Sequence, residues 1–270
     1  MNKILVKGVF GNWNYVKCRK SDLKFDLEDD AEICVIDWHV GHEDIKEETL
    51  RQLVDWALAK SHRYFVLQDF LDDNWLSKYS RLTYGSDEEG GELQRVKKQL
   101  KILEPVYHRF LFQIGSNHWM RKFGLHLPPE RSQKARTQFN EIYGEICKIN
   151  PDFKIYYSTQ CIINLNFRTL PNLKIPFIHP SRLGSSSTAL NRASNYFGYD
   201  GLIIGHVPSN LQKTIQSVMG KKLPVWFVSH LFGEQPEYEK ERMATFEPSQ
   251  PLILKWKRNL LTGKWEFDRV

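Results

Sequence analysis

The sequence predicts an α/β protein with two β-sheets and flanking helices. Three observations predict this class. In the first half, short apolar runs at 32–38 and 64–70 flank an amphipathic helix. In the second half, strand-like runs dominate. No internal repeat, low-complexity tract or linker divides the 270 residues. We therefore expect a single domain over 1–270, with a surface insertion at 73–91.

The first half is expected to begin with a hairpin and to continue as a β-α-β unit. The runs at 4–10 and 14–20 are expected to pair around the Gly11–Asn12 turn. A helix over 47–62 repeats leucine, valine and alanine on one face, and it separates the two buried runs named above. Such a unit implies parallel strands joined by a right-handed crossover.

The rest of the chain alternates at first and then becomes rich in strands. The further expected helices cover 92–104, 135–149 and 188–197. The further expected strands cover 109–115, 153–159, 161–167, 173–179, 201–206, 223–230 and 251–257, and a turn at Leu261–Gly263 leads into a last strand at 264–270. A second sheet is therefore expected from this half.

Composition excludes several classes of protein. Hydrophobic residues at 41% and aromatic residues at 13% are enough for a packed core, which excludes a disordered chain. The four cysteines are scattered with no CxxC pair, so neither a disulfide framework nor a thiolate zinc site is expected. No apolar run reaches membrane-spanning length, and we expect a cytoplasmic protein with no membrane partner. The net charge of +6 permits an anionic partner.

Residue types that bind metals follow five of the expected strands. These residues are Asp37 with His39, then Asp69, Asn117, His179 and His206. Each has an ordinary alternative, because Asp caps helices, Asn and His occur in turns, and single histidines occur in cores. In open α/β sheets, however, ligands bind beyond the carboxyl ends of the strands. The ordered combination therefore predicts one metal site.

The chemistry of this set is that of a hydrolase with one or two metals. A carboxylate such as Asp69 is able to bridge two cations about 3.5–4 Å apart. Imidazole, amide and carboxylate ligands suit divalent ions. We favour Mn²⁺, with Zn²⁺, Fe²⁺ and Mg²⁺ as alternatives. Such ions lower the pKa of bound water, so no covalent protein nucleophile is needed.

Five short segments resemble the motifs of one enzyme family. They read DWHVG (37–41), QDFLD (68–72), GSNHW (115–119), FIH (177–179) and GHVP (205–208). In order and spacing they resemble the calcineurin-like metallophosphoesterases, over residues 32–230. The resemblance implies a four-layer α/β/β/α sandwich of two mixed sheets flanked by helices. It also implies hydrolysis of a phosphate ester by a metal-activated water.

The resemblance further implies a role for each matched position. The first metal would be held by Asp37 and His39, the bridge would be Asp69, and the second metal would be held by Asn117, His179 and His206. His118 would lie beside the substrate as general acid or transition-state donor. Asp72 would orient the His118 imidazole.

Four positions depart from the family pattern. Gln68 replaces a glycine, Ser116 is inserted and Trp119 replaces an acidic residue, and we expect these changes to be tolerated. Pro208 stands where the family has a histidine that completes the first metal site. That site is then weaker or empty, or another side chain replaces the lost ligand. The candidates are Asn210, His230 and His42.

Basic and aromatic residues near the motifs favour a nucleic-acid or nucleotide phosphodiester as substrate. The basic residues are Arg121, Lys122, Arg131, Lys134 and Arg136, and the tryptophans are Trp38, Trp75 and Trp119. Tryptophan is able to stack a base, and Arg182 and Arg121 are candidates for binding phosphate. The alternative is that these arginines and lysines are simply solvated and that the tryptophans belong to the core.

Three other functions stay open from sequence. The chain could be a phosphomonoesterase or protein phosphatase. It could be a degenerate relative that binds phosphate-bearing partners without turnover, although retention of His118, Asp72 and Asp69 argues against that. The histidines could also be structural, in a basic binding module. The oligomeric state is not predicted.

Overall fold

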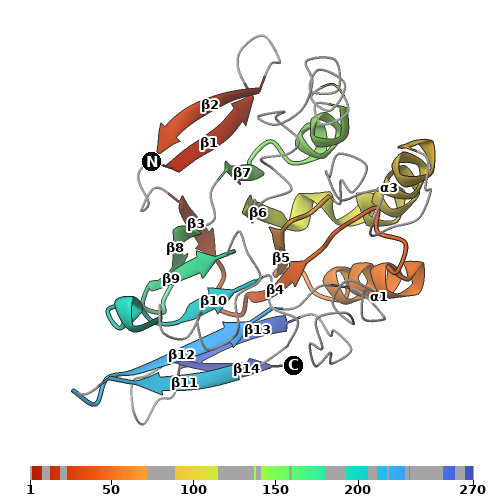
Figure 1. Ribbon diagram of the computed structural model, residues 1–270. Coiled ribbons are helices and arrows are strands. Elements are labelled where there is room, and N and C mark those ends of the chain that lie inside the picture. The colour runs from red at the N-terminus through yellow and green to blue at the C-terminus, as the bar shows by residue number, and fades with distance from the viewer. Residues whose placement is uncertain are drawn as a thin grey trace, which may run out of the picture.

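The computed structural model describes most of the chain. The described residues are 2–7, 13–18, 23–71, 89–114, 137, 141–157, 160–179, 193–205, 212–217, 219–228, 231, 252–258 and 265–269. Within them the chain forms two mixed β-sheets that pack face to face, with α1 and α3 on the far side of the larger sheet (Figure 1). The predicted α/β sandwich of two mixed sheets is confirmed.

The larger sheet has eight strands in the order β14-β13-β4-β5-β6-β7-β1-β2. They are β1 (Asn2–Lys7), β2 (Trp13–Cys18), β4 (Glu32–Asp37), β5 (Arg63–Gln68), β6 (Phe110–Ile114), β7 (Lys154–Tyr157), β13 (Leu252–Arg258) and β14 (Trp265–Arg269). The four central strands run parallel, which confirms the predicted β-α-β unit. The hairpins β1–β2 and β13–β14 were also predicted, and both pairs are antiparallel.

The smaller sheet has six strands in the order β11-β12-β10-β9-β8-β3. They are β3 (Leu23–Leu27), β8 (Gln160–Phe167), β9 (Leu173–Ile178), β10 (Leu202–Ile204), β11 (Gln212–Gln216) and β12 (Lys222–Phe227). Strands β9, β10 and β12 run parallel. The edge strands β3 and β11 were not predicted, because each has only five residues and β11 is largely polar.

Helices cover the outer faces of both sheets. They are α1 (Glu47–Leu58), α3 (Glu89–Leu103), the 3-10 helix η2 (Glu104–Arg109), residues 141–149 and the 3-10 helix η3 (Ser194–Tyr196). Helix α1 ends four residues before the predicted end, because β5 already begins at Arg63. Helix α3 begins three residues before the predicted start, at Glu89. The predicted helix at 188–197 is, in its described part, little more than η3.

Alternation along the strands divides the core into layers. On β4, Cys34 and Ile36 pack against α1 and α3, while Ile33 and Val35 face the smaller sheet. A third cluster lies on the outer face of the smaller sheet, where η3 and Ala193 cover Ile204 and Val225. Burying each such side chain contributes about 1.5–3 kcal/mol. The layers therefore run helix, sheet, sheet and helix, with the last layer formed mainly by η3 among the described residues.

None of the described helices is both long and apolar enough to span a membrane.

Candidate metal centre

Three side chains from distant parts of the chain meet at the carboxyl ends of the strands. Asp37 is the last residue of β4, Asp69 follows β5, and His179 follows β9 in the facing sheet. All three are fully buried. Their ligand atoms all lie within 4.8 Å of one another. The structure therefore brings together three of the six predicted metal ligands.

The distances at this cluster suit a single divalent ion. The His179 Nε2 atom lies 3.5 Å from Asp37 Oδ2 and 3.6 Å from Asp69 Oδ2. An ion with bonds of about 2.0–2.2 Å separates its ligand atoms by about 3–4 Å. Burying two carboxylates side by side is costly unless positive charge compensates them. A divalent cation fits both the spacing and the charge.

His39 extends the cluster on the other side of Asp37. Its Nε2 lies 3.2 Å from Asp37 Oδ1, whereas His179 approaches Asp37 Oδ2. The two oxygens of Asp37 thus face two different imidazoles. His39 itself is buried, with 4% of its surface exposed. The four predicted ligands in the described part of the chain, Asp37, His39, Asp69 and His179, are therefore all buried and lie next to one another.

The backbone holds His39 and Asp69 beside each other in an unusual conformation. Both residues have positive φ, 49° at His39 and 36° at Asp69. Such values are uncommon for residues other than glycine, and His and Asp are among the types that tolerate them best. The pairing of β4 with β5 continues beyond the strands, where the His39 N–H donates to the Asp69 carbonyl at 2.9 Å. Backbone strain of this kind gathers at functional sites.

Helix α3 fixes the loop that follows His39. The N–H of Gly41 donates to Gln99 Oε1 at 2.7 Å, and Gln99 Nε2 donates to the His42 carbonyl at 3.4 Å. Arg95 Nε donates to the Gly41 carbonyl at 3.0 Å. Gly41 has φ of 107°, a value that favours glycine. The helix thereby restrains the backbone two residues beyond His39.

Replacing Gln99 with Leu should loosen this loop. The change removes both hydrogen bonds at a buried position, so we expect the free energy of unfolding to fall by about 1–3 kcal/mol. Mn²⁺ binding should weaken with it, because His39 loses its restraint. Urea unfolding and calorimetric Mn²⁺ titration measure the two effects. Gln52→Leu on the exposed face of α1 is the matched control and should change neither. Equal behaviour of the two variants would contradict the restraining role.

His42, one of the candidates to replace the ligand missing at Pro208, is also buried. Its Nδ1 accepts the Asp44 N–H at 3.2 Å and lies 3.5 Å from Asp44 Oδ2. That nitrogen is therefore engaged in a local turn. His42 does not belong to the group formed by Asp37, Asp69 and His179.

Several predicted site residues lie outside the described part of the chain. They are Asp72, Asn117, His118, Arg121, Arg182 and His206, together with Asn210, His230 and the departure at Pro208. Their roles stay predictions. The basic segment 121–136 lies outside it as well, as do residues 73–88 of the insertion predicted at 73–91. Residues 89–91 belong to helix α3 and not to an insertion.

The prediction that Trp38 is able to stack a base is wrong. Its ring is fully buried in an aromatic cluster with Phe65, Phe70 and Phe110, at centroid distances of 5.5, 5.7 and 6.2 Å. The alternation of β4 points this side chain toward the helices and away from Asp37. Trp38 is a core residue.

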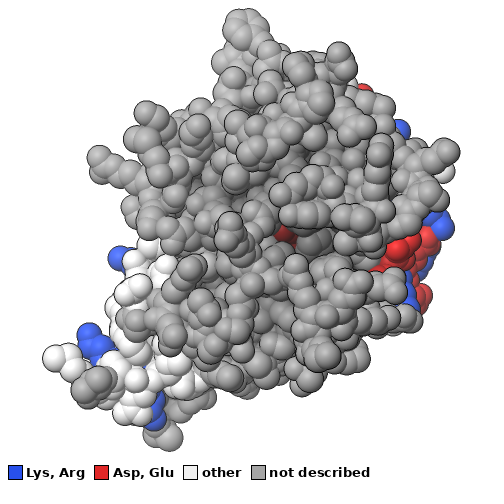
Figure 2. Space-filling model, in the orientation of Figure 1, with Lys and Arg blue, Asp and Glu red and all other residues white. Residues whose placement is uncertain are grey.

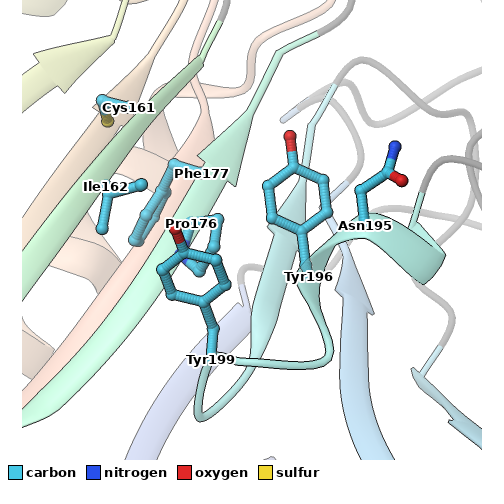
Figure 3. A pocket seen from close by; sticks show the side chains of 7 residues that line it. All are labelled: Cys161, Ile162, Pro176, Phe177, Asn195, Tyr196 and Tyr199. Carbon is cyan, nitrogen blue, oxygen red and sulfur yellow. The ribbon is translucent and has the colours of Figure 1, made fainter. Parts of the chain in front are cut away.

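A separate cavity of about 340 Å³ lies between η3 and the strands β8 and β9. It is lined by Cys161, Ile162, Pro176, Phe177, Asn195, Tyr196 and Tyr199 (Figure 3). The rings of Tyr196 and Tyr199 lie 5.9 Å apart. Sequence reasoning did not single out these residues, because nothing in their spacing marks a pocket. Because η3 covers the outer face of the smaller sheet, the cavity lies on the opposite side of β9 from the layer that holds His179.

Described charges on the face shown in Figure 2 gather in two places. Acidic and basic side chains alternate over α1 and α3, where Glu47 pairs with both Arg51 and Lys98. Lysines occupy the β11–β12 hairpin, where Lys221 and Lys222 are exposed. Neither group of charged residues is next to a metal ligand in the sequence.

Comparison with known proteins finds likeness to solved structures alone. No protein-family model matches the chain, and no curated protein matches it. Wild-type Vps29 from Entamoeba histolytica complexed with Zn²⁺ aligns at 13% identity and a TM-score of 0.37, covering 88% of this chain and 98% of that one. The hypothetical protein PH1004 from Pyrococcus horikoshii OT3 aligns at 11% identity and a TM-score of 0.40, covering 89% and 88%.

A cold-active protein-tyrosine phosphatase from a psychrophilic Shewanella species is a third similar structure. It aligns at 12% identity and a TM-score of 0.36, covering 98% of this chain and 89% of that one. TM-scores and identities this low carry no inference about activity.

Proposed function

We propose that the chain is a metal-dependent phosphoesterase whose nucleophile is water. The observation that carries this proposal is the meeting of Asp37, Asp69 and His179, all fully buried, with ligand atoms within 4.8 Å of one another. A divalent cation bound there lowers the pKa of water and offsets the negative charge of a phosphoryl group.

The chain's own residues would divide the work as follows. Asp37 and Asp69 supply the negative charge that retains a cation, and His39 and His179 supply neutral nitrogen ligands. Their burial strengthens every electrostatic interaction at the site. His118, with Asp72 as its orienting partner, would donate a proton to the leaving oxygen. Positioned acids of this kind are common in hydrolases.

We further propose a phosphodiester of a nucleotide or nucleic acid as the substrate, and Mn²⁺ as the ion. The net charge of +6 permits a polyanionic substrate. Arg121 and Arg182 are proposed to bind phosphate oxygens.

A metal-dependent assay tests the proposal. Purified protein is stripped of metal, reloaded with Mn²⁺ and supplied with bis-p-nitrophenyl phosphate or p-nitrophenyl phosphate. We expect turnover that requires Mn²⁺ and favours the diester. A variant His118→Ala should bind Mn²⁺ normally and turn over slowly.

Each other result has a distinct meaning. Preference for the monoester would favour a phosphomonoesterase. If the protein binds Mn²⁺ but turns over neither substrate, it would be a relative of such enzymes that binds phosphate-bearing partners without hydrolysing them. Failure of the protein to bind any divalent ion would overturn the proposal altogether.

A further inference from the structure

Gln68 lies beside Asp37 on the face of the larger sheet that looks toward the smaller sheet. The two residues are paired across the parallel strands β5 and β4. Side chains alternate along a strand, and Val35 and Val66, two residues earlier, both face the smaller sheet. Asp37 and Gln68 therefore point into the same layer, from strands about 4.8 Å apart.

The carboxamide of Gln68 is buried without a hydrogen-bond partner among the described residues. This holds for both Oε1 and Nε2, and the residue is fully buried. Leaving such a group unsatisfied costs about 1–3 kcal/mol. The neighbouring buried glutamines each have at least one partner. Gln113 Oε1 accepts the Tyr143 hydroxyl at 2.6 Å, although its Nε2 has no partner among the described residues, and both amide atoms of Gln99 bind the loop after His39. An apolar side chain of the same size would fill the position of Gln68 without that cost.

The Gln68 carboxamide packs directly against the backbone of Gly205, and this contact places its oxygen beside the metal ligands. A Cβ atom at position 205 would lie 1.7 Å from Gln68 Oε1 and 2.9 Å from His179 Cδ2. Both atoms thus approach the same point, so the carboxamide oxygen borders the His179 ring. The Cδ2 atom is bonded to Nε2, the nitrogen that faces Asp37 and Asp69.

We infer that Gln68 is a further ligand of the metal centre, which supplies a neutral oxygen to the cation held by Asp37, Asp69 and His179. This inference rests on the proposed function, because it needs a cation at that place. Two carboxylates already balance a divalent charge, and an amide oxygen adds a ligand without adding a third negative charge. An added oxygen ligand favours Mn²⁺ or Mg²⁺ over Zn²⁺. The amide nitrogen remains a donor for a phosphoryl oxygen.

The test compares Gln68→Met with wild-type protein, both stripped of metal. Methionine has nearly the same volume and lacks the oxygen. Since even residues behind metal ligands contribute about 10–100-fold to affinity, we expect Mn²⁺ to bind at least about 10-fold more weakly by calorimetric titration. The stripped variant should resist urea as well as wild type, or better, because it buries no unsatisfied amide. Gln68→Glu keeps an oxygen at the position and should bind Mn²⁺ at least as tightly as wild type.

Gln113→Met is the matched control, on the neighbouring strand β6. It loses the hydrogen bond from Tyr143, so the stripped protein should be less stable while its Mn²⁺ affinity stays unchanged. If Gln68→Met binds Mn²⁺ within about twofold of the wild-type affinity, Gln68 only fills space and the inference is overturned. The proposed function would then still stand. If Gln68→Met does not fold, Gln68→Glu decides, and weaker Mn²⁺ binding by it overturns the inference. Absence of Mn²⁺ binding by wild-type protein overturns both.

Discussion

Asp69→Asn should abolish turnover and weaken Mn²⁺ binding by more than about 100-fold, since even residues behind the ligands contribute 10–100-fold. Asparagine has the shape of aspartate and tolerates the positive φ of 36° at this position. The change therefore removes charge and little else. Because two buried carboxylates repel each other without a cation, the stripped variant should be at least as stable as stripped wild type. The Mn²⁺ affinity should thus fall while the stability of the metal-free protein stays the same or rises.

Calorimetric Mn²⁺ titration and urea unfolding of the stripped proteins measure these effects. Asp30→Asn is the matched control, because Asp30 is 77% exposed and pairs with His62 away from the site. That variant should bind Mn²⁺ like wild type. Retention of tight Mn²⁺ binding by Asp69→Asn would remove Asp69 from the metal centre and with it the proposed mechanism.

Gly205→Ala should strongly destabilise the protein. The added methyl group would stand 1.7 Å from the Gln68 oxygen, so Gln68, His179 or the strand β10 must move. Overpacking of a buried site costs about 1–3 kcal/mol, and contact with a fully buried carboxamide places this change at the upper end of that range. Displacement of His179 should also weaken Mn²⁺ binding. Urea unfolding and Mn²⁺ titration test the two effects.

A second substitution identifies the cause. Gln68→Ala removes the two nearest atoms that the new methyl group would meet and leaves only His179 Cδ2, at 2.9 Å. Gly205→Ala should therefore cost less in that background, with a coupling free energy of about 0.5–3 kcal/mol. Gly144→Ala is the control: a Cβ there meets nothing within 4 Å, and the residue lies in the helical segment 141–149. It should be neutral or stabilising by about 0.4–1 kcal/mol. Additive effects of the first two changes would show that Gln68 does not fill the space over Gly205.

Hydrophobic periodicity predicted most of the elements and missed those whose stability comes from neighbours. The strand β3 alternates buried and exposed residues over only five positions, and its pairing partner β8 lies more than 130 residues away. The strand β11 reads QKTIQ and forms because β12 pairs with it at the sheet edge. Backbone pairing of this kind depends on what lies alongside, which a local pattern does not contain.

The candidate site was predictable in its ligands and not in its surroundings. Asp37 and Asp69 lie at the carboxyl ends of neighbouring parallel strands of one sheet, so their meeting could be expected. His179 follows an apolar strand of the other sheet and joins them through the packing of the two sheets. From the family pattern alone, Gln68 is expected to be only a tolerated departure. Its proposed role at the metal centre depends on its strand pairing with Asp37 and on its close contact with Gly205. Both involve residues far apart in the chain.

The sequence by itself determined the class of fold, the central parallel strands and the kind of side chain at their ends, because periodicity and residue chemistry are local properties. Tertiary structure alone decided that His179 faces both carboxylates, that Trp38 belongs to the core and that the Gln68 amide borders the ligands. These facts depend on how two sheets pack against each other. Their packing brings together side chains more than a hundred residues apart, and it buries them where charge and hydrogen bonding act most strongly.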